Sequence, residues 1–195
     1  MRLGRDKAFE PFGKGILVER VLSRLSLFKS DIILVKNHKQ DFTHLDSQNI
    51  KVVEDIYPEK GPLGGIYTGL SFSQTQKNVV VACDMPFLNT GLLVYLVQQS
   101  EEHDIVVPCE NDHFEPLHAV YSKRCVGPIK ELLDKGEKQL IRLFKMVDVR
   151  YVRPGEIERF DPHHISFFNI NNEEDLKRAR LLDNLESELT GFIED

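Results

Sequence analysis

The stretch VVVACDMPFLNT, residues 79–90, indicates the class of fold. Its first five residues are apolar and mostly β-branched, which is typical of a strand buried on both faces of a parallel sheet. Pro86 cannot donate a hydrogen bond within a sheet, so the strand is expected to end before it. Asp84 is therefore predicted at the carboxyl end of a central strand, where open α/β sheets bind their ligands. The competing interpretation is that Asp84 only caps the helix that starts near Thr90.

Strands and helices alternate along the chain on either side of this stretch. Hydrophobic periodicity predicts strands at 31–36, 50–55, 79–83, 104–108, 114–121, 147–152 and 165–170. It predicts helices at 15–29, 61–73, 90–100, 127–136, 138–146 and 172–185. Residues 1–15 are expected to form a loop. The pattern predicts a three-layer, Rossmann-like α/β fold in one domain, 1–195, whose mostly parallel sheet carries helices on both faces.

Composition narrows the class of protein. The chain has 195 residues, enough for one well-buried domain, and 31 acidic against 25 basic residues give a net charge of −6. This balance argues against a general nucleic-acid-binding protein. The three cysteines are sparse and odd in number, which is typical of a reducing compartment, and Cys83 and Cys109 are expected to be buried. No stretch approaches 18 apolar residues, so we expect a cytoplasmic protein with no membrane partner.

Two stretches carry groups suited to phosphate. RLGRDKAF, residues 2–9, gathers Arg2, Arg5 and Lys7 around a glycine, and such cations bind phosphate oxygens. A solvated basic surface is the alternative interpretation. GPLGG, residues 61–65, enters a helix, and its glycines would let a phosphate or base approach the backbone. A plain turn explains this second stretch equally well.

Polar side chains also follow the predicted strands. Asp55 and Asp84 could share one Mg²⁺, or one could hold the metal while the other accepts hydrogen bonds from a base or ribose. Asn169 and Asn171 follow the predicted strand 165–170, although Asn171 or Asn172 could simply cap the next helix. The histidines lack metal-type spacing with cysteines and are expected to be surface or packing residues, with His118 placed in a strand.

Five motifs, taken in order, resemble the molybdenum cofactor guanylyltransferase (MobA) family of nucleotidyltransferases. They are RLGRDKA (2–8), GPLGGI (61–66), CDMPFL (83–88), EPLHAVY (115–121) and NINNEEDL (169–176). The resemblance covers nearly the whole chain. CDMPFL occurs widely among nucleotidyltransferases, whereas GPLGGI favours this branch over its cytidylyl-transferring relatives.

The resemblance implies transfer of GMP from GTP to the terminal phosphate of molybdopterin, with release of pyrophosphate. GTP and molybdopterin would be the substrates, and molybdoenzymes or other cofactor-biosynthesis proteins would be candidate protein partners. Matching positions imply Mg²⁺ held by Asp84 and triphosphate charge neutralised by Lys7 and Arg2. They further imply guanosine contacts from Asn37 and Asp55, room near the nucleotide at Gly64 and Gly65, and contacts to the metal or the pterin phosphate from Asn169 and Asn171.

The chain departs from the family pattern in two places. It lacks the first strand and the LxGGxS half of the opening motif, which predicts an unpaired slot in the sheet. Either the true start lies upstream of Met1, which we favour, or the protein is a shortened form that binds nucleotide less tightly. Glu115 stands where relatives often carry His or Gln, and near a polyphosphate this acid would need a cation as partner.

Three other functions remain as alternatives. The first is a cytidylyl- or sugar-nucleotide transferase on the same fold. The second is a non-catalytic homologue that binds a nucleotide or a protein partner. The third is a plain flavodoxin-type domain, which would leave Asp55, Asp84 and GPLGG without a shared explanation.

Overall fold

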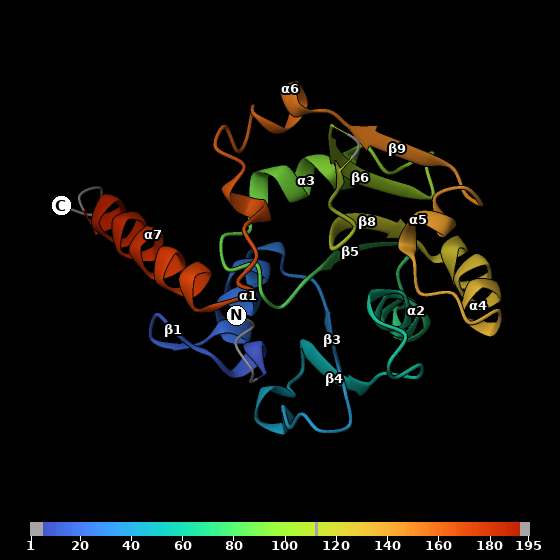
Figure 1. Cartoon of the computed structure of the whole chain (residues 1–195), viewed down its shortest axis with the longest axis horizontal. Helices are drawn as coiled ribbons and strands as arrows, with labels where there is room; N and C mark the ends of the chain where they lie inside the picture. Colours follow the sequence, from blue (N-terminus) through green and yellow to red (C-terminus); the bar gives the residue numbers. More distant parts are fainter. Residues whose placement is uncertain (1–5, 112, 192–195) are drawn as a thin grey trace.

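The computed structural model of the chain describes residues 6–111 and 113–191, with side chains as far as residue 185. Its largest sheet has the strand order β5 (Lys77–Val81), β8 (His118–Ser122) and β6 (Ile105–Glu110), and β6 also pairs with β7 (His113–Phe114) and β9 (Val149–Val152). A second sheet pairs β3 (Ile32–Lys36) with β4 (Ile50–Glu54). Figure 1 shows the two sheets one above the other, with helices on either side.

Strand directions agree with the predicted class. β3 and β4 pair in parallel, as do β6 and β9. β8 pairs antiparallel with both β5 and β6, and β7 pairs antiparallel with β6, so β5, β6 and β9 run in one direction and β7 and β8 run against them. The prediction of an α/β fold with a mostly parallel arrangement is confirmed.

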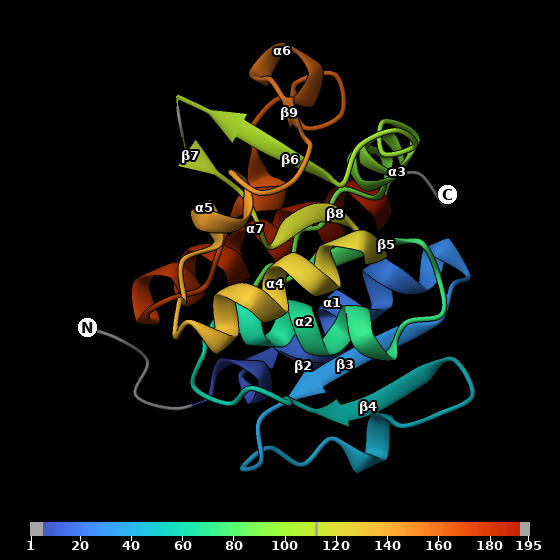
Figure 2. The same ribbon diagram turned by 90° about the vertical axis from the view of Figure 1, so that its right-hand side faces the viewer.

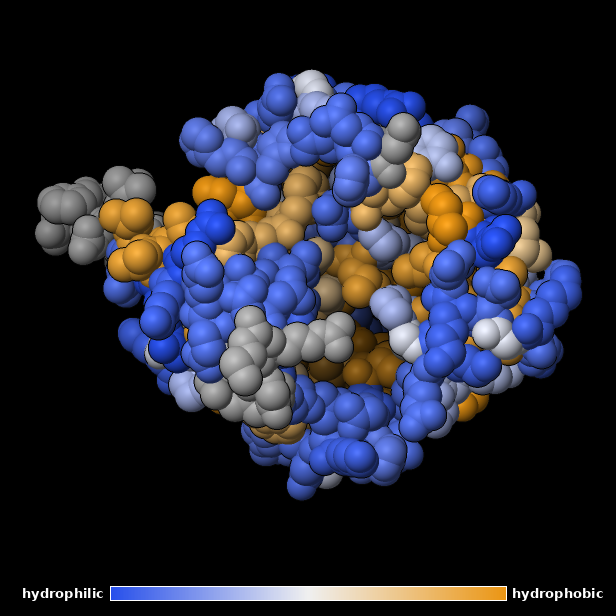
Figure 3. All heavy atoms as spheres, viewed as in Figure 1, coloured by the Kyte–Doolittle hydropathy of each residue, from blue (hydrophilic) through white to orange (hydrophobic). Residues whose placement is uncertain are grey.

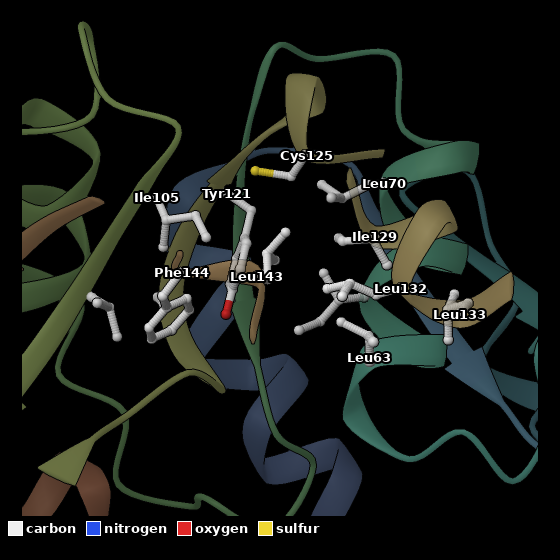
Figure 4. Close-up of a cluster of buried hydrophobic side chains, with 13 residues drawn as sticks. Leu63, Leu70, Ile105, Tyr121, Cys125, Ile129, Leu132, Leu133, Leu143 and Phe144 are labelled. Carbon is white, nitrogen blue, oxygen red and sulfur yellow. The ribbon is translucent and has the colours of Figure 1, made fainter. Parts of the chain in front are cut away.

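Helices cover both faces of the large sheet. On one face, α2 (Pro62–Phe72) and α4 (Val126–Asp134) bury Leu63, Ile129 and their neighbours against Tyr121 of β8 (Figures 2 and 4). On the other face, α1 (Leu17–Leu25) and α3 (Thr90–Gln98) pack on alternate residues of the same strands. The remaining helices are α5 (Leu140–Leu143), α6 (Pro154–Ile157) and α7 (Glu173–Gly191). No helix in the described ranges is long and apolar enough to cross a membrane.

One predicted strand is a helical turn. Residues 165–170 were expected to be extended, but Ile165–Phe167 form the 3₁₀ helix η5. The reason is the buried carboxylate of Asp161, which accepts hydrogen bonds from the backbone N–H of Ile165 (3.0 Å) and Ser166 (2.8 Å) and from the Ser166 hydroxyl (2.5 Å). These bonds close the backbone into a turn. Asn169 and Asn171 therefore follow a turn and not a strand.

Several boundaries also differ. The strand expected at 79–83 spans Lys77–Val81, is half-buried, and pairs antiparallel with β8, so its burial on both faces was wrong. Segment 114–121 is interrupted at Pro116, whose carbonyl accepts a hydrogen bond from the Tyr121 hydroxyl (2.8 Å). The helix expected at 138–146 is reduced to α5. Within the segment expected to be a loop, the structure has the 3₁₀ helix η1 (Lys7–Phe9) and a hairpin that pairs β1 (Pro11–Phe12) with β2 (Gly15–Ile16).

The cysteines match the prediction in part. Cys109 is buried as expected, but Cys83 is exposed because it follows the end of β5.

The predicted slot lies between β3 and β5. Among the described residues, β3 pairs only with β4 and β5 only with β8, so each strand has one edge without a partner strand. All five residues of both strands are half-buried, whereas every residue of β8 is buried. Figure 3 shows a hollow with hydrophobic walls in the middle of this side of the molecule.

Candidate active site

Lys7 brings together two of the predicted site residues. Its Nζ donates to Asp84 Oδ2 (2.9 Å) and to Asn171 Oδ1 (2.7 Å), which are 77 and 164 residues away in sequence. The Lys7 and Asp84 side chains are 30% and 17% exposed, so the ion pair is reachable from solvent and yet partly shielded from it. These contacts rule out the interpretation that Asp84 only caps the next helix, and the Asn89 side chain caps that helix through the Leu92 N–H (2.9 Å).

Local structure fixes the Lys7 backbone. Asp6 caps η1, because its Oδ1 accepts a hydrogen bond from the Ala8 N–H (3.1 Å). Ala8 is buried among Val18, Leu22 and Phe42, which anchors the turn against α1. Buried Ala8 and the cap therefore hold Lys7 in position beside Asp84.

A second contact ties this segment to the loop after β3. Asp6 Oδ2 accepts from Gln40 Nε2 (2.6 Å), and Gln40 Oε1 accepts from the Asn37 N–H (2.9 Å). Neither Asp6 nor Gln40 was among the predicted site residues. The N-cap spacing of Asp6 before KAF could have indicated its capping role, whereas no local pattern marks Gln40.

The two asparagines enter the site from the turn after η5. The Ile170 N–H donates to the Asp84 carbonyl (3.0 Å), which places both neighbours of Ile170 close to the Asp84 backbone. Asn169 Nδ2 donates to the Phe167 carbonyl (3.1 Å), so its Oδ1 is the atom that could serve as a ligand. The alternative capping role falls to Asn172, whose Oδ1 accepts from the N–H groups of Glu174 and Asp175.

Asn37 and Asp55 follow adjacent strands. Lys36 and Glu54 are register partners, and the Asp55 N–H donates to the Lys36 carbonyl (2.8 Å). Asn37 Oδ1 accepts from the Lys39 N–H (2.9 Å). Asp55 Oδ1 accepts from the Tyr57 N–H (3.0 Å) and the Thr68 hydroxyl (2.8 Å). Both side chains thus shape their own loops, and Asp55 Oδ2 remains as an acceptor for another group.

Gly64 and Gly65 of GPLGG differ in their surroundings. A Cβ on Gly64 would lie 2.6 Å from the Tyr57 carbonyl oxygen, so the absence of a side chain is needed for close packing of α2 on the loop after β4. A Cβ on Gly65 would meet no described atom within 4 Å. The N–H groups of both residues donate to the Gly61 carbonyl. Because a side chain at Gly65 would meet no described atom, Gly65 is the position beside which space is open.

The oxygen atoms around Lys7 fit a hard divalent cation. Asp84 Oδ2 and Asn171 Oδ1 already converge on one ammonium group, and carboxylate and amide oxygens are ligands that Mg²⁺ accepts. The described residues contain no group of three His, Cys, Asp or Glu side chains that could hold a metal. The site therefore fits an ion held by few protein ligands and completed by substrate phosphates or water, as is usual for Mg²⁺.

The other predicted residues lie apart from Lys7, Asp84 and Asn171, or they fall outside the residues that the structure describes. Arg2, with Gly4 and Arg5, falls outside the described residues. His118 is fully buried in β8, which agrees with a packing role, while His164 pairs with Glu110 (3.2 Å).

Comparison with known proteins shows the family. Residues 1–151 match the family model described as "MobA-like NTP transferase domain". The chain is 34% identical over 192 residues to a probable molybdenum cofactor guanylyltransferase of Pelotomaculum thermopropionicum, covering 98% of this chain and 91% of the relative. It is 36% identical over 181 residues to a protein of the same description from Methanosarcina mazei, covering 88% and 81% of the two chains.

Solved structures agree. Molybdopterin-guanine dinucleotide biosynthesis protein A from Archaeoglobus fulgidus superposes with a TM-score of 0.81 at 27% identity, covering 94% of this chain and 93% of that one. The 4-diphosphocytidyl-2C-methyl-D-erythritol synthase of Anaerococcus prevotii, at 16% identity and a TM-score of 0.67, covers 89% and 88% and shares the fold. The family model decides against a flavodoxin-type domain. The chain belongs to the MobA-like NTP transferase family.

Proposed function

We propose that this chain is a molybdenum cofactor guanylyltransferase, which transfers GMP from GTP to the terminal phosphate of molybdopterin and releases pyrophosphate. The observation that carries the proposal is the contact of Lys7 Nζ with both Asp84 and Asn171. This contact joins three sequence motifs at one partly shielded point at the carboxyl end of β5. The relatives described above support the choice of guanylyl transfer.

The reaction is an in-line displacement. An oxygen of the acceptor's phosphate attacks the α-phosphorus of GTP, a new P–O bond forms, and the bond to the β-phosphate oxygen breaks to release pyrophosphate. Both reactants are polyanions, so catalysis consists mainly of neutralising charge and aligning the two groups. Lys7 would contact the phosphates: its ammonium group lies among acceptor oxygens, and its side chain is 30% exposed.

The same residues would hold Mg²⁺. Asp84 would supply the carboxylate ligand, and Asn171, with Asn169 beside it, would supply amide oxygens. When bound, the ion neutralises negative charge on the phosphates. In its presence, Lys7 would exchange its bond to Asp84 for one to a phosphate oxygen.

Selectivity for the base would come from the other sheet. Asn37 and Asp55 sit at the carboxyl ends of β3 and β4, and Gly64 packs against the loop that carries Asp55. Asp55 Oδ2 could accept hydrogen bonds from guanine N–H groups or a ribose hydroxyl, and Gly65 leaves space beside it. A cytidylyltransferase or sugar-nucleotide transferase would need a different set of contacts here.

The test is calorimetric titration of the protein with GTP and with CTP, each with Mg²⁺, followed by assay of pyrophosphate release with molybdopterin. We expect binding of GTP, weaker binding of CTP, and release that needs the acceptor. Lys7→Met should slow release by about 10²- to 10³-fold, while Lys177→Met, at an exposed position of α7, should not change it. Preference for CTP would favour the cytidylyl alternative, and GTP binding without turnover would favour the non-catalytic one.

A further inference from the structure

A cavity beside the proposed active site is not used by the mechanism above. It has a volume of about 250 Å³, and its walls include Pro108, Phe167 and two carboxylates, Glu110 and Glu115. Ligand pockets in proteins usually start at about 300 Å³, so a cavity of this size takes one flat ring system and not a whole cofactor.

The two carboxylates differ in their surroundings. Glu110 is bound by His164 Nδ1 at 3.2 Å, and its side chain is 53% exposed. Glu115 is half-buried, and among the described residues no side chain makes a hydrogen bond or an ion pair with its carboxylate, although the charge of His113 acts to lower its pKa. A carboxylate withdrawn from water without a partner is unfavourable, and burial raises the pKa of Glu115. The Glu115 carboxylate is therefore able to accept hydrogen bonds from a ligand.

The walls of the cavity are connected to the segments that carry Asp84 and Asn169, and not to the proposed guanosine contacts. The Ala82 N–H donates to the Leu117 carbonyl (3.0 Å), so the chain from Glu115 runs beside the residues that lead to Asp84. Phe167 is bonded to Asn169 Nδ2 through its carbonyl (3.1 Å), next to Asn171. Asn37 and Asp55, the proposed guanosine contacts, are on the other sheet.

We propose that Glu115 binds the 2-amino-4-oxo edge of the acceptor's pterin ring, so that this cavity is the pterin subsite. This inference rests on the proposed function. The pterin edge offers two adjacent N–H donors, which match the two oxygens of a carboxylate, and Pro108 and Phe167 supply apolar walls for the flat ring. With the ring held there, the terminal phosphate of the acceptor extends toward Lys7 and Asp84.

Glu115 was also the position where the sequence departs from related proteins, which often carry His or Gln. In this site its partner is the pterin N–H edge, so no cation is needed. It is a specificity-determining residue for the acceptor, and its loss should raise the KM for the acceptor without changing that for GTP.

The experiment compares the wild-type protein with Glu115→Gln and with the matched control Glu102→Gln, an exposed residue before β6 that carries the same charge. Two readouts are taken: binding of 6-hydroxymethylpterin by its fluorescence, and steady-state guanylyl transfer with GTP and molybdopterin varied in turn. We expect Glu115→Gln to weaken pterin binding and raise the KM for molybdopterin by roughly 10- to 100-fold, with the KM for GTP retained and the melting temperature not lowered. Glu102→Gln should match the wild type.

The outcomes separate the two proposals. If the wild type shows no guanylyl transfer, the proposed function fails. If it is active and Glu115→Gln leaves pterin binding and the KM for molybdopterin unchanged, the pterin subsite is wrong. A rise in the KM for GTP alone would also overturn it, because Glu115 would then contact the guanine.

Discussion

The Lys7 side chain is the single group on which the proposed site depends. Replacing it with Met keeps the stem but removes the charge that contacts Asp84 and Asn171. We expect kcat/KM for guanylyl transfer to fall about 10²- to 10³-fold, the effect usual for one electrostatic contact to a transition state. Steady-state pyrophosphate release measures it. Activity within a factor of two of the wild type would mean that Lys7 does not contact the phosphates.

Glu115 should lower stability at neutral pH. Its pKa is raised above the ordinary value of 4.5, chiefly by burial, so the folded state binds the proton more tightly than the unfolded state. Below both pKa values the residue is protonated in each state and has no effect. As the pH rises through 4.5 and past the folded pKa, the folded protein loses stability. Glu115→Gln should therefore melt at a higher temperature at pH 7, with an advantage that shrinks toward pH 4.

A thermal melt at several pH values tests this expectation. Glu102→Gln, on an exposed loop, provides the comparison and should show no such trend. A lower melting temperature for Glu115→Gln at pH 7 would mean that the carboxylate has a stabilising partner. The expected gain in stability fits a residue kept for its ligand, since binding groups are often unfavourable in the unliganded fold.

His118 has the opposite dependence on pH. It is fully buried, neither ring nitrogen has a hydrogen-bond partner among the described residues, and burial lowers its pKa to about 4. The unfolded state, with a pKa near 6.5, therefore gains the proton first as the pH falls. Its contribution to stability is complete above pH 6.5 and is lost between 6.5 and 4.

His118→Leu should flatten this part of the stability curve. Between pH 6.5 and 4 the wild type should lose roughly 2–4 kcal/mol more free energy of unfolding than His118→Leu does. Denaturant unfolding at each pH measures it, with the exposed His163→Gln as control. An unchanged acid limb would show that another group dominates acid unfolding.

At the scale of elements, the turn after α6 decides where the asparagines lie. Asp161 is 6% exposed and accepts the three hydrogen bonds that close η5. Asp161→Ala would leave those donors without their acceptor, so we expect unfolding to become easier by about 3 kcal/mol and kcat to fall as Asn169 and Asn171 move. Urea unfolding and the transfer assay measure the two effects.

Asp161→Asn provides the control for this prediction. It keeps one acceptor oxygen and should recover part of both losses. If Asp161→Ala lowered stability but left kcat unchanged, the turn would have no part in positioning the asparagines.

The sequence predicted elements well where burial sets the pattern and poorly where a distant side chain does. Repeated apolar residues located β3, β4, α2 and α3 within a few positions. ISFFNI looks like a strand by the same criterion, yet Asp161 turns it into η5. The same holds for the site residues. The position of Asp84 after a strand was predictable from the local pattern. Its contact with Lys7, 77 residues away, was not, because it depends on how η1 packs on α1.

At the scale of the whole molecule, the unpaired edges of β3 and β5 should show in hydrogen exchange. The Ile32 N–H bonds toward β4 and the Ala82 N–H toward β8, so strand alternation directs the N–H groups of Ile33, Val35, Val79 and Val81 to the open side. We expect these amides to exchange at least about 100-fold faster than those of Val106 and Val120 in the buried strands.

Exchange followed by NMR at residue level tests this expectation. The buried strands β6 and β8 serve as the internal reference in the same sample. Equal protection of all four strands would mean that the open edges are paired in solution.

The separation of the two sheets also has a mechanical consequence. Asn37 and Asp55 are carried by one sheet and Asp84 by the other, and no strand-to-strand ladder among the described residues fixes the distance between them. The links across this seam include α2, whose Gly69 would place a Cβ 3.7 Å from Val35, and the hydrogen bond between Asp6 and Gln40. Displacement by about 1 Å can slow such a reaction 100-fold. A nucleotide that contacts both sheets would therefore hold them in a fixed relative position. Part of its binding free energy would be used to align the two sheets, and its measured affinity would be lower by that amount.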